Sequence, residues 1–231
     1  FIEMANASGL PLLQDFQRNP TETTTYGTGE LIRDALEKGC RKIIIGIGGS
    51  ATNDAGTGML QALGYRFLDK DGNPLGQGGK ILENTVHICT QNVHKELKNA
   101  HFIVACDVNN PFHGPKGAAH IFARQKGAND SMIEELDKGM RSFANVIHQT
   151  TGKDISHVPG SGAAGGMGAA LLAYLNATLT SGSRLVLETI GFEKALSGAQ
   201  LVITGEGHSD AQTLMGKLPF GVLNAARKQR V

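Results

Sequence analysis

KIIIGIGGSATND, residues 42–54, decides how this sequence folds. Its first part, KIIIGIG at 42–48, is a continuous β-branched run, which is typical of a strand buried on both faces of a parallel sheet. A glycine-rich turn follows at once, and residues 56–64 then predict a helix. A strand, a short turn and a helix in this order form the unit from which α/β proteins are built.

The same alternation continues along the rest of the chain. Residues 101–107 (HFIVACD) and 200–207 (QLVITGEG) predict two further buried strands. Helices are expected over residues 29–38 with Thr28 as the cap, from the capping box of Ser131 and Glu134, over residues 164–176, and from about Pro219. The pattern predicts an α/β fold with a mostly parallel sheet layered by helices. Ligands gather beyond the carboxyl ends of such strands, and each of the three strands runs into a polar motif.

Composition narrows the class of partner. The 231 residues carry 22 basic and 21 acidic side chains, a net charge of +1, no Trp and 5% aromatic residues, which argues against nucleic acid and anionic membranes as partners. No apolar stretch approaches the roughly 20 residues that span a bilayer, and no signal peptide is visible. Three widely spaced cysteines fit neither a disulfide framework nor a zinc site, so we expect reduced thiols in a cytoplasmic protein.

The turn after the first strand is the clearest candidate site. Its candidate binding residues are Gly48, Gly49, Ser50, Thr52, Asn53 and Asp54. The glycines let the backbone approach an anion, the hydroxyls donate hydrogen bonds, and the following helix offers free N–H groups with a partial positive charge. The last two residues could position a substrate hydroxyl or a magnesium ion. A tight strand-to-helix turn capped by Asp54 is an equally good interpretation of these residues.

Carboxylates follow the other two predicted strands. Asp107 stands where the second strand should end, and could be a base, a metal ligand or, slightly better, a turn cap. The loop at 204–217 (TGEGHSDAQTLMGK) carries Glu206, Asp210 and Lys217, a set that suits magnesium and phosphate. A charged loop with a salt bridge is the alternative there.

Two further motifs favour a structural interpretation. The glycines of GSGAAGGMGAA (160–170) satisfy G-x-G-x-x-G, but Pro159 interrupts the approach and no good strand precedes it, so close packing is favoured over dinucleotide binding. The cations Lys116, Arg124 and Lys126 could hold phosphates, but a solvated basic surface is the favoured interpretation.

Several long phrases resemble the glycerate kinase family. They are FIEMANASGL, YGTGELI, IIIGIGGSATNDAGTGMLQALG, ACDVNNPFHGPKGAA with QKGA, PGSGAAGGMGAALLAYL, and LVITGEG with the residues after it. The phrases occur in family order over almost the whole chain, and IGGSATND together with ITGEG is highly specific to the family.

The resemblance implies transfer of the γ-phosphoryl group of ATP to a hydroxyl of D-glycerate, with 2-phosphoglycerate as the favoured product. It implies Mg²⁺ held by Asp210 and Glu206, and catalytic roles for these two carboxylates and Asp107. It also implies two domains, an inserted α/β substrate domain at 1–195 and part of a Rossmann- or flavodoxin-like nucleotide domain at 196–231. A homodimer is left open.

The sequence also departs from the family pattern. The PDSFKGS-like loop, whose lysine is a candidate for phosphate handling, is not found, and His208 stands where an arginine is usual. The first and last residues suggest that both ends are cuts. A non-catalytic or substrate-binding fragment is therefore one alternative function, and a dinucleotide-dependent oxidoreductase is a weaker one.

Overall fold

The computed structural model describes residues 1–205 and 218–231. Their contacts form two compact units. The first consists of Phe1–Val104 and Val108–Leu179, and the second of Ala105–Asp107 and Thr180–Val231.

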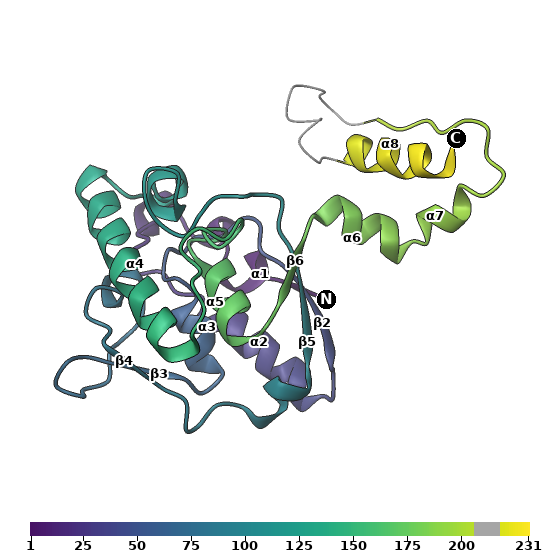
Figure 1. Cartoon of the computed structure of the whole chain (residues 1–231). Helices are drawn as coiled ribbons and strands as arrows, with labels where there is room; N and C mark the ends of the chain where they lie inside the picture. The colour runs from purple at the N-terminus through teal and green to yellow at the C-terminus, as the bar shows by residue number, and fades with distance from the viewer. Residues whose placement is uncertain (206–217) are drawn as a thin grey trace. The chain divides into compact units, whose positions relative to one another are not determined.

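Strands and helices alternate in the first unit, and helices dominate the second (Figure 1). The strands are β1 (Ile2–Glu3), β2 (Lys42–Gly46), β3 (Arg66–Leu68), β4 (His87–Cys89), β5 (His101–Ala105) and β6 (Thr178–Thr180). The α-helices are α1 (Ala5–Ser8), α2 (Tyr26–Glu37), α3 (Thr57–Ala62), α4 (Asp130–Thr151), α5 (Met167–Tyr174), α6 (Gly182–Thr189), α7 (Phe192–Ala195) and α8 (Leu218–Gln229). Short 3₁₀ turns are η1 (Leu10–Leu12), η2 (Asp15–Gln17), η3 (Gly79–Ile81), η4 (Lys95–Asn99) and η6 (Arg124–Lys126), and η5 (Ala119–Ala123) is a π-helical turn.

A four-stranded sheet in the order β1-β2-β5-β6 confirms the predicted α/β class. β1 pairs in parallel with β2, with Ile2 opposite Ile45. Directly after β5, the N–H of Cys106 donates to the carbonyl of Thr180, the last residue of β6, so β5 and β6 end at the same edge of the sheet. The β-branched residues Ile43 and Ile45 are buried, as a central strand requires.

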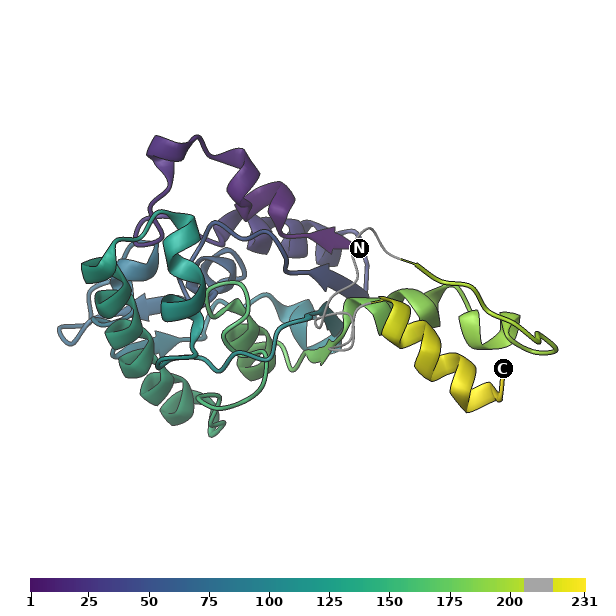
Figure 2. The same cartoon turned by 90° about the horizontal axis from the view of Figure 1, so that it is seen from above.

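Helices α3, α4 and α5 and the two-stranded β3–β4 ribbon lie on one side of this sheet (Figures 1 and 2). α2 packs closely on α3 because Gly29 has no side chain: a Cβ there would lie 2.3 Å from the carbonyl oxygen of Met59. α4 buries its apolar stripe, and its Phe143 ring packs 5.8 Å from that of Phe67 on β3. The core that results holds the turn after β2 in place.

Two predicted helix starts are wrong in detail. α2 begins at Tyr26 rather than after Thr28, whose hydroxyl is buried against that of Ser8 at 2.8 Å. α4 is capped by Asn129, which accepts from the N–H of Met132, and not by the Ser131 capping box. Both positions lie within a turn of the predicted one, because several residues in each stretch can accept such a bond.

The predicted strand at 200–207 is not a strand over its described part. Residues 201–205 are irregular, and Leu201 and Ile203 are 75% and 88% exposed. A strand forms only against a neighbour that supplies its hydrogen bonds, and no described strand lies beside this segment. The β-branched run therefore identified an apolar segment without fixing its structure.

The second unit contains α6, α7 and α8, and α6 contacts both of the others. Its boundary with the first unit falls between Leu179 and Thr180. The division into a substrate domain at 1–195 and a nucleotide-type domain from 196 stays a prediction, because compactness does not say what either part binds.

Candidate functional site

The glycine turn after β2 lies open at the carboxyl end of that strand. Gly48 and Gly49 are exposed, and a Cβ built at Gly48 would meet no atom within 4 Å. Gly49 has φ +70°, a conformation that favours glycine. The backbone N–H groups of these two residues are therefore accessible, and their role in binding an anion stays a prediction.

The segment after α1 holds this turn from one side. The N–H of Leu10 donates to the carbonyl of Gly49 at 2.8 Å, and the N–H of Ala51 donates to the carbonyl of Ser8 at 2.9 Å. Within the part of the chain that the structure describes, no acceptor is found for the N–H groups of Gly48 and Gly49. The turn is thus fixed through other groups while these donors stay available.

Asp54 is fully buried and organises the backbone behind the turn. Its carboxylate accepts from the N–H and hydroxyl of Thr25 at 2.8 and 2.9 Å, and from the N–H groups of Gly56 and Gly58 at 3.1 and 3.2 Å. Burial raises the pKa of this carboxyl, and these hydrogen bonds oppose the shift. These hydrogen bonds are those expected if Asp54 caps the turn between β2 and α3. A role of Asp54 in substrate binding stays a prediction.

The remaining predicted residues of the turn, Ser50, Thr52 and Asn53, are also buried. The Asn53 amide donates to the sulfur of Met140 at 3.2 Å. Its carbonyl oxygen and the Thr52 hydroxyl find no partner among the described residues. Buried polar atoms without hydrogen-bond partners are rare in protein cores. Their presence at Thr52 and Asn53 is therefore consistent with a functional site at this turn.

Lys126 is the residue that sequence reasoning missed. It was expected on a solvated surface, but it is 2% exposed and lies directly behind the turn. Its ammonium donates to the Ser50 hydroxyl at 2.8 Å and to the Thr52 carbonyl at 2.7 Å. The expectation was wrong because the residues next to Lys126 in sequence form no apolar pattern that would indicate burial. Arg124 does lie at the surface, paired with Asp130, and Lys116 is exposed.

The glycines at 160–168 pack against the turn instead of opening toward solvent. A Cβ at Gly165 would lie 2.0 Å from the Thr52 carbonyl oxygen, and one at Gly162 would lie 2.1 Å from that of Pro111. The N–H of Ala55 donates to the carbonyl of Gly165 at 3.0 Å. This geometry matches the close-packing interpretation and leaves no space for a pyrophosphate at these glycines.

Asp107 belongs to the second unit and is exposed. Its carboxylate accepts from the N–H of Gly182 at 2.8 Å, at the first residue of α6. The bond is that of a helix-start cap, and a catalytic role stays a prediction. Glu206, Asp210 and Lys217 lie outside the described residues, as does His208.

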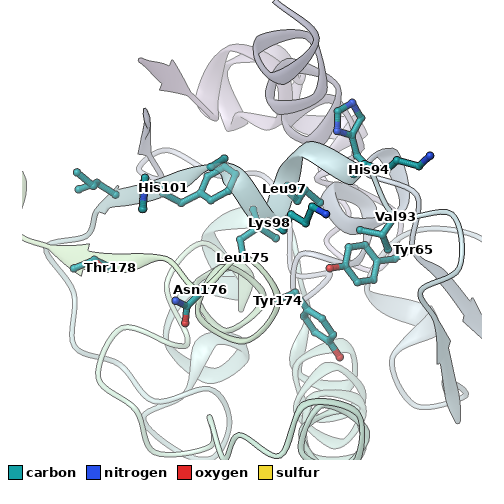
Figure 3. Close-up of a pocket in the computed structure, with 14 residues that line it drawn as sticks. Tyr65, Val93, His94, Leu97, Lys98, His101, Tyr174, Leu175, Asn176 and Thr178 are labelled. Carbon is teal, nitrogen blue, oxygen red and sulfur yellow. The ribbon is translucent and has the colours of Figure 1, made fainter. Parts of the chain in front are cut away.

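A cavity of about 790 Å³ lies elsewhere in the first unit, where β5 and β6 begin (Figure 3). Tyr65 and Tyr174 form part of its wall with their rings 5.3 Å apart, and Lys98, His101 and Asn176 line it as well. Ligands of parallel α/β sheets bind at the opposite, carboxyl ends of the strands. The open glycine turn is therefore the better candidate.

Other classes of site are not found in the described residues. Across residues 1–205 and 218–231, no three His, Cys, Asp or Glu side chains are grouped so that they could hold a metal ion. No helix in the same ranges has the length and apolar character needed to cross a membrane. None of the three cysteines is in a disulfide.

Known proteins match the chain throughout. Residues 1–231 match the model of the glycerate kinase family. The chain is 49% identical over 230 residues to a glycerate kinase of Halalkalibacterium halodurans and 51% identical over 228 residues to a glycerate 2-kinase of Escherichia coli. These matches cover 100% and 99% of this chain, which spans about 60% of the length of each relative.

A solved structure agrees with the fold. The crystal structure of a protein assigned as glycerate kinase 2 from Salmonella typhimurium matches with a TM-score of 0.92 and 50% identity. The match covers 99% of this chain and 61% of that one.

Proposed function

The chain belongs to the glycerate kinase family, and from this premise we propose that the protein transfers the γ-phosphoryl group of ATP to a hydroxyl of D-glycerate, giving 2-phosphoglycerate. The family match over the whole chain carries this proposal. The open glycine turn at the carboxyl end of β2 supports it, because a glycerate carboxylate or a phosphate needs backbone donors of this kind.

In the proposed reaction the substrate hydroxyl oxygen bonds to the γ-phosphorus as the bond from that phosphorus to the β,γ-bridging oxygen breaks. The hydroxyl proton is released to water, and ADP leaves with the electron pair of the broken bond. Such a transfer depends mainly on positioning and on neutralising charge. We assign the first task to Gly48 and Gly49, with their N–H groups on the glycerate carboxylate. Lys126 holds the turn in place by donating to the hydroxyl of Ser50 and the carbonyl of Thr52.

Magnesium and a cytoplasmic location are further parts of the proposal. Among residues 1–205 and 218–231, no cluster fits a metal ion. Glu206 and Asp210 remain the proposed ligands, and Asp210 the first choice for a residue whose loss abolishes turnover.

A charge placed on the open face of the turn tests the proposal. Gly48→Asp is expected to fold, because its Cβ meets open space, and to lower kcat/KM for glycerate about 30-fold or more, since two like charges a few ångströms apart at a protein surface repel by about 2 kcal/mol or more. Steady-state kinetics with D-glycerate and ATP measure this.

Gly76→Asp is the matched control. Gly76 is also exposed with open space around its Cβ, so the variant makes the same charge change far from the turn in sequence. It is expected to keep wild-type kinetics. Equal kinetics for the two variants would show that no anion binds at the turn.

A further inference from the structure

Lys126 is a buried cation that contacts the glycine turn after β2. Its ammonium reaches the turn from behind, through the hydroxyl of Ser50 and the carbonyl of Thr52. Gly49, with its exposed backbone, is the residue directly before Ser50. A positive charge therefore lies one residue behind the surface where an anion would bind.

No ion pair within the described residues neutralises this charge. Asp54 is the acidic group that acts on it, and its carboxylate is hydrogen-bonded to Thr25, Gly56 and Gly58 instead. Burial lowers the pKa of Lys126 to about 7, and the attraction of Asp54 opposes that shift.

Several other charged side chains near this segment are paired. Arg18, whose backbone packs on Gly127, pairs with Asp15 at 2.9 Å. Arg124 pairs with Asp130 on the same segment as the lysine, and both are exposed. His120 and Arg141 both face Asp137. The charge behind the turn is therefore set by the protonation of Lys126 itself.

We propose that Lys126 is a positioning residue that acts through Ser50, and that its positive charge behind the Gly48–Ser50 turn sets the affinity of this turn for the carboxylate of the substrate. The inference rests on the proposed function. An anion on the turn stabilises the protonated lysine, and by linkage the protonated lysine strengthens anion binding. Above neutral pH, binding of the anion then takes up a proton.

The pH dependence of the glycerate KM tests this in the intact enzyme at saturating ATP. The pKa of the glycerate carboxylate lies near 3.5, so it does not titrate between about pH 6 and pH 8.5. The pKa of the lysine lies within that range, so its charge is present at the acidic end and lost as the pH rises. We expect the KM to rise about five- to tenfold over this range, as for a linked pKa shift of about one unit, with a smaller change in kcat.

Variants separate charge from structure. Lys126→Met is expected to give a high KM that no longer depends on pH, and Lys126→Arg, charged at every pH, a KM that stays low at alkaline pH. Lys116→Met removes an exposed cation from the same region and is the matched control, with the wild-type pH profile expected. A Lys126→Met enzyme that keeps the wild-type profile would overturn the inference.

Calorimetry of the wild-type enzyme tests the role of Lys126 even if these variants do not fold. Titration with D-glycerate near pH 7.5, in two buffers of different ionisation enthalpy, is expected to show uptake of about half a proton. Zero uptake would overturn the inference while leaving the proposed function intact. A wild-type enzyme that does not phosphorylate glycerate at any pH would contradict the proposed function, and the inference with it.

Discussion

Gly165→Ala is expected to destabilise the protein by about 3–5 kcal/mol, enough to leave a marginally stable fold largely unfolded. The added Cβ would lie 2.0 Å from the carbonyl oxygen of Thr52 and 2.6 Å from the Cα of Asn53. Both neighbours are backbone of the turn, so they cannot move aside as a side chain does. Urea denaturation followed by circular dichroism measures the loss.

Gly152→Ala separates this clash from the cost of the backbone conformation. Gly152 has φ +72°, close to the +65° of Gly165, but a Cβ there meets nothing within 4 Å. Its replacement is expected to cost only about 1–2 kcal/mol, the penalty of a left-handed conformation for alanine. Similar losses for the two variants would mean that the glycine segment does not pack on the turn as described.

Asp54→Ala is expected to cost about 3–5 kcal/mol as well, because removing one partner of a buried charged network leaves the others unpaired. The groups that lose this acceptor are the hydroxyl of Thr24, the N–H and hydroxyl of Thr25, and the N–H groups of Gly56 and Gly58. These groups join the starts of α2 and α3, so both helix ends and the turn between β2 and α3 are expected to loosen together. The midpoint of urea denaturation reports the loss.

Asp69→Ala is the matched control for this second variant. Asp69 also accepts from two backbone N–H groups, those of Asp71 and Asn73, at 2.9 and 2.8 Å. That turn lies at the surface, where water can replace the lost acceptor, so we expect a loss of under about 1 kcal/mol. If Asp54→Ala were no more damaging than Asp69→Ala, the carboxylate would not organise the turn.

Local sequence patterns predicted the regions of β2, β5, α2 to α5 and α8, because the causes of these elements are local. β2 is indicated by the continuous β-branched run before Gly46, and α4 by apolar residues spaced three and four apart. Both patterns follow from burial of the element itself. The same reasoning failed for Leu201 and Ile203, where a similar apolar run lies exposed without a described neighbouring strand. Pairing is a property of two segments, and one segment cannot reveal it.

For the candidate site, the sequence by itself determined the open glycines, the position of the turn after a buried strand, and the family to which the chain belongs. Tertiary structure alone decided what lies behind the turn. It buried Asp54 beneath donors from Thr24, Thr25, Gly56 and Gly58, and it brought Lys126, 76 residues away in sequence, to the hydroxyl of Ser50. A glycine's freedom is fixed by its own atoms, whereas burial and the pKa of a buried charge depend on every segment that packs around it.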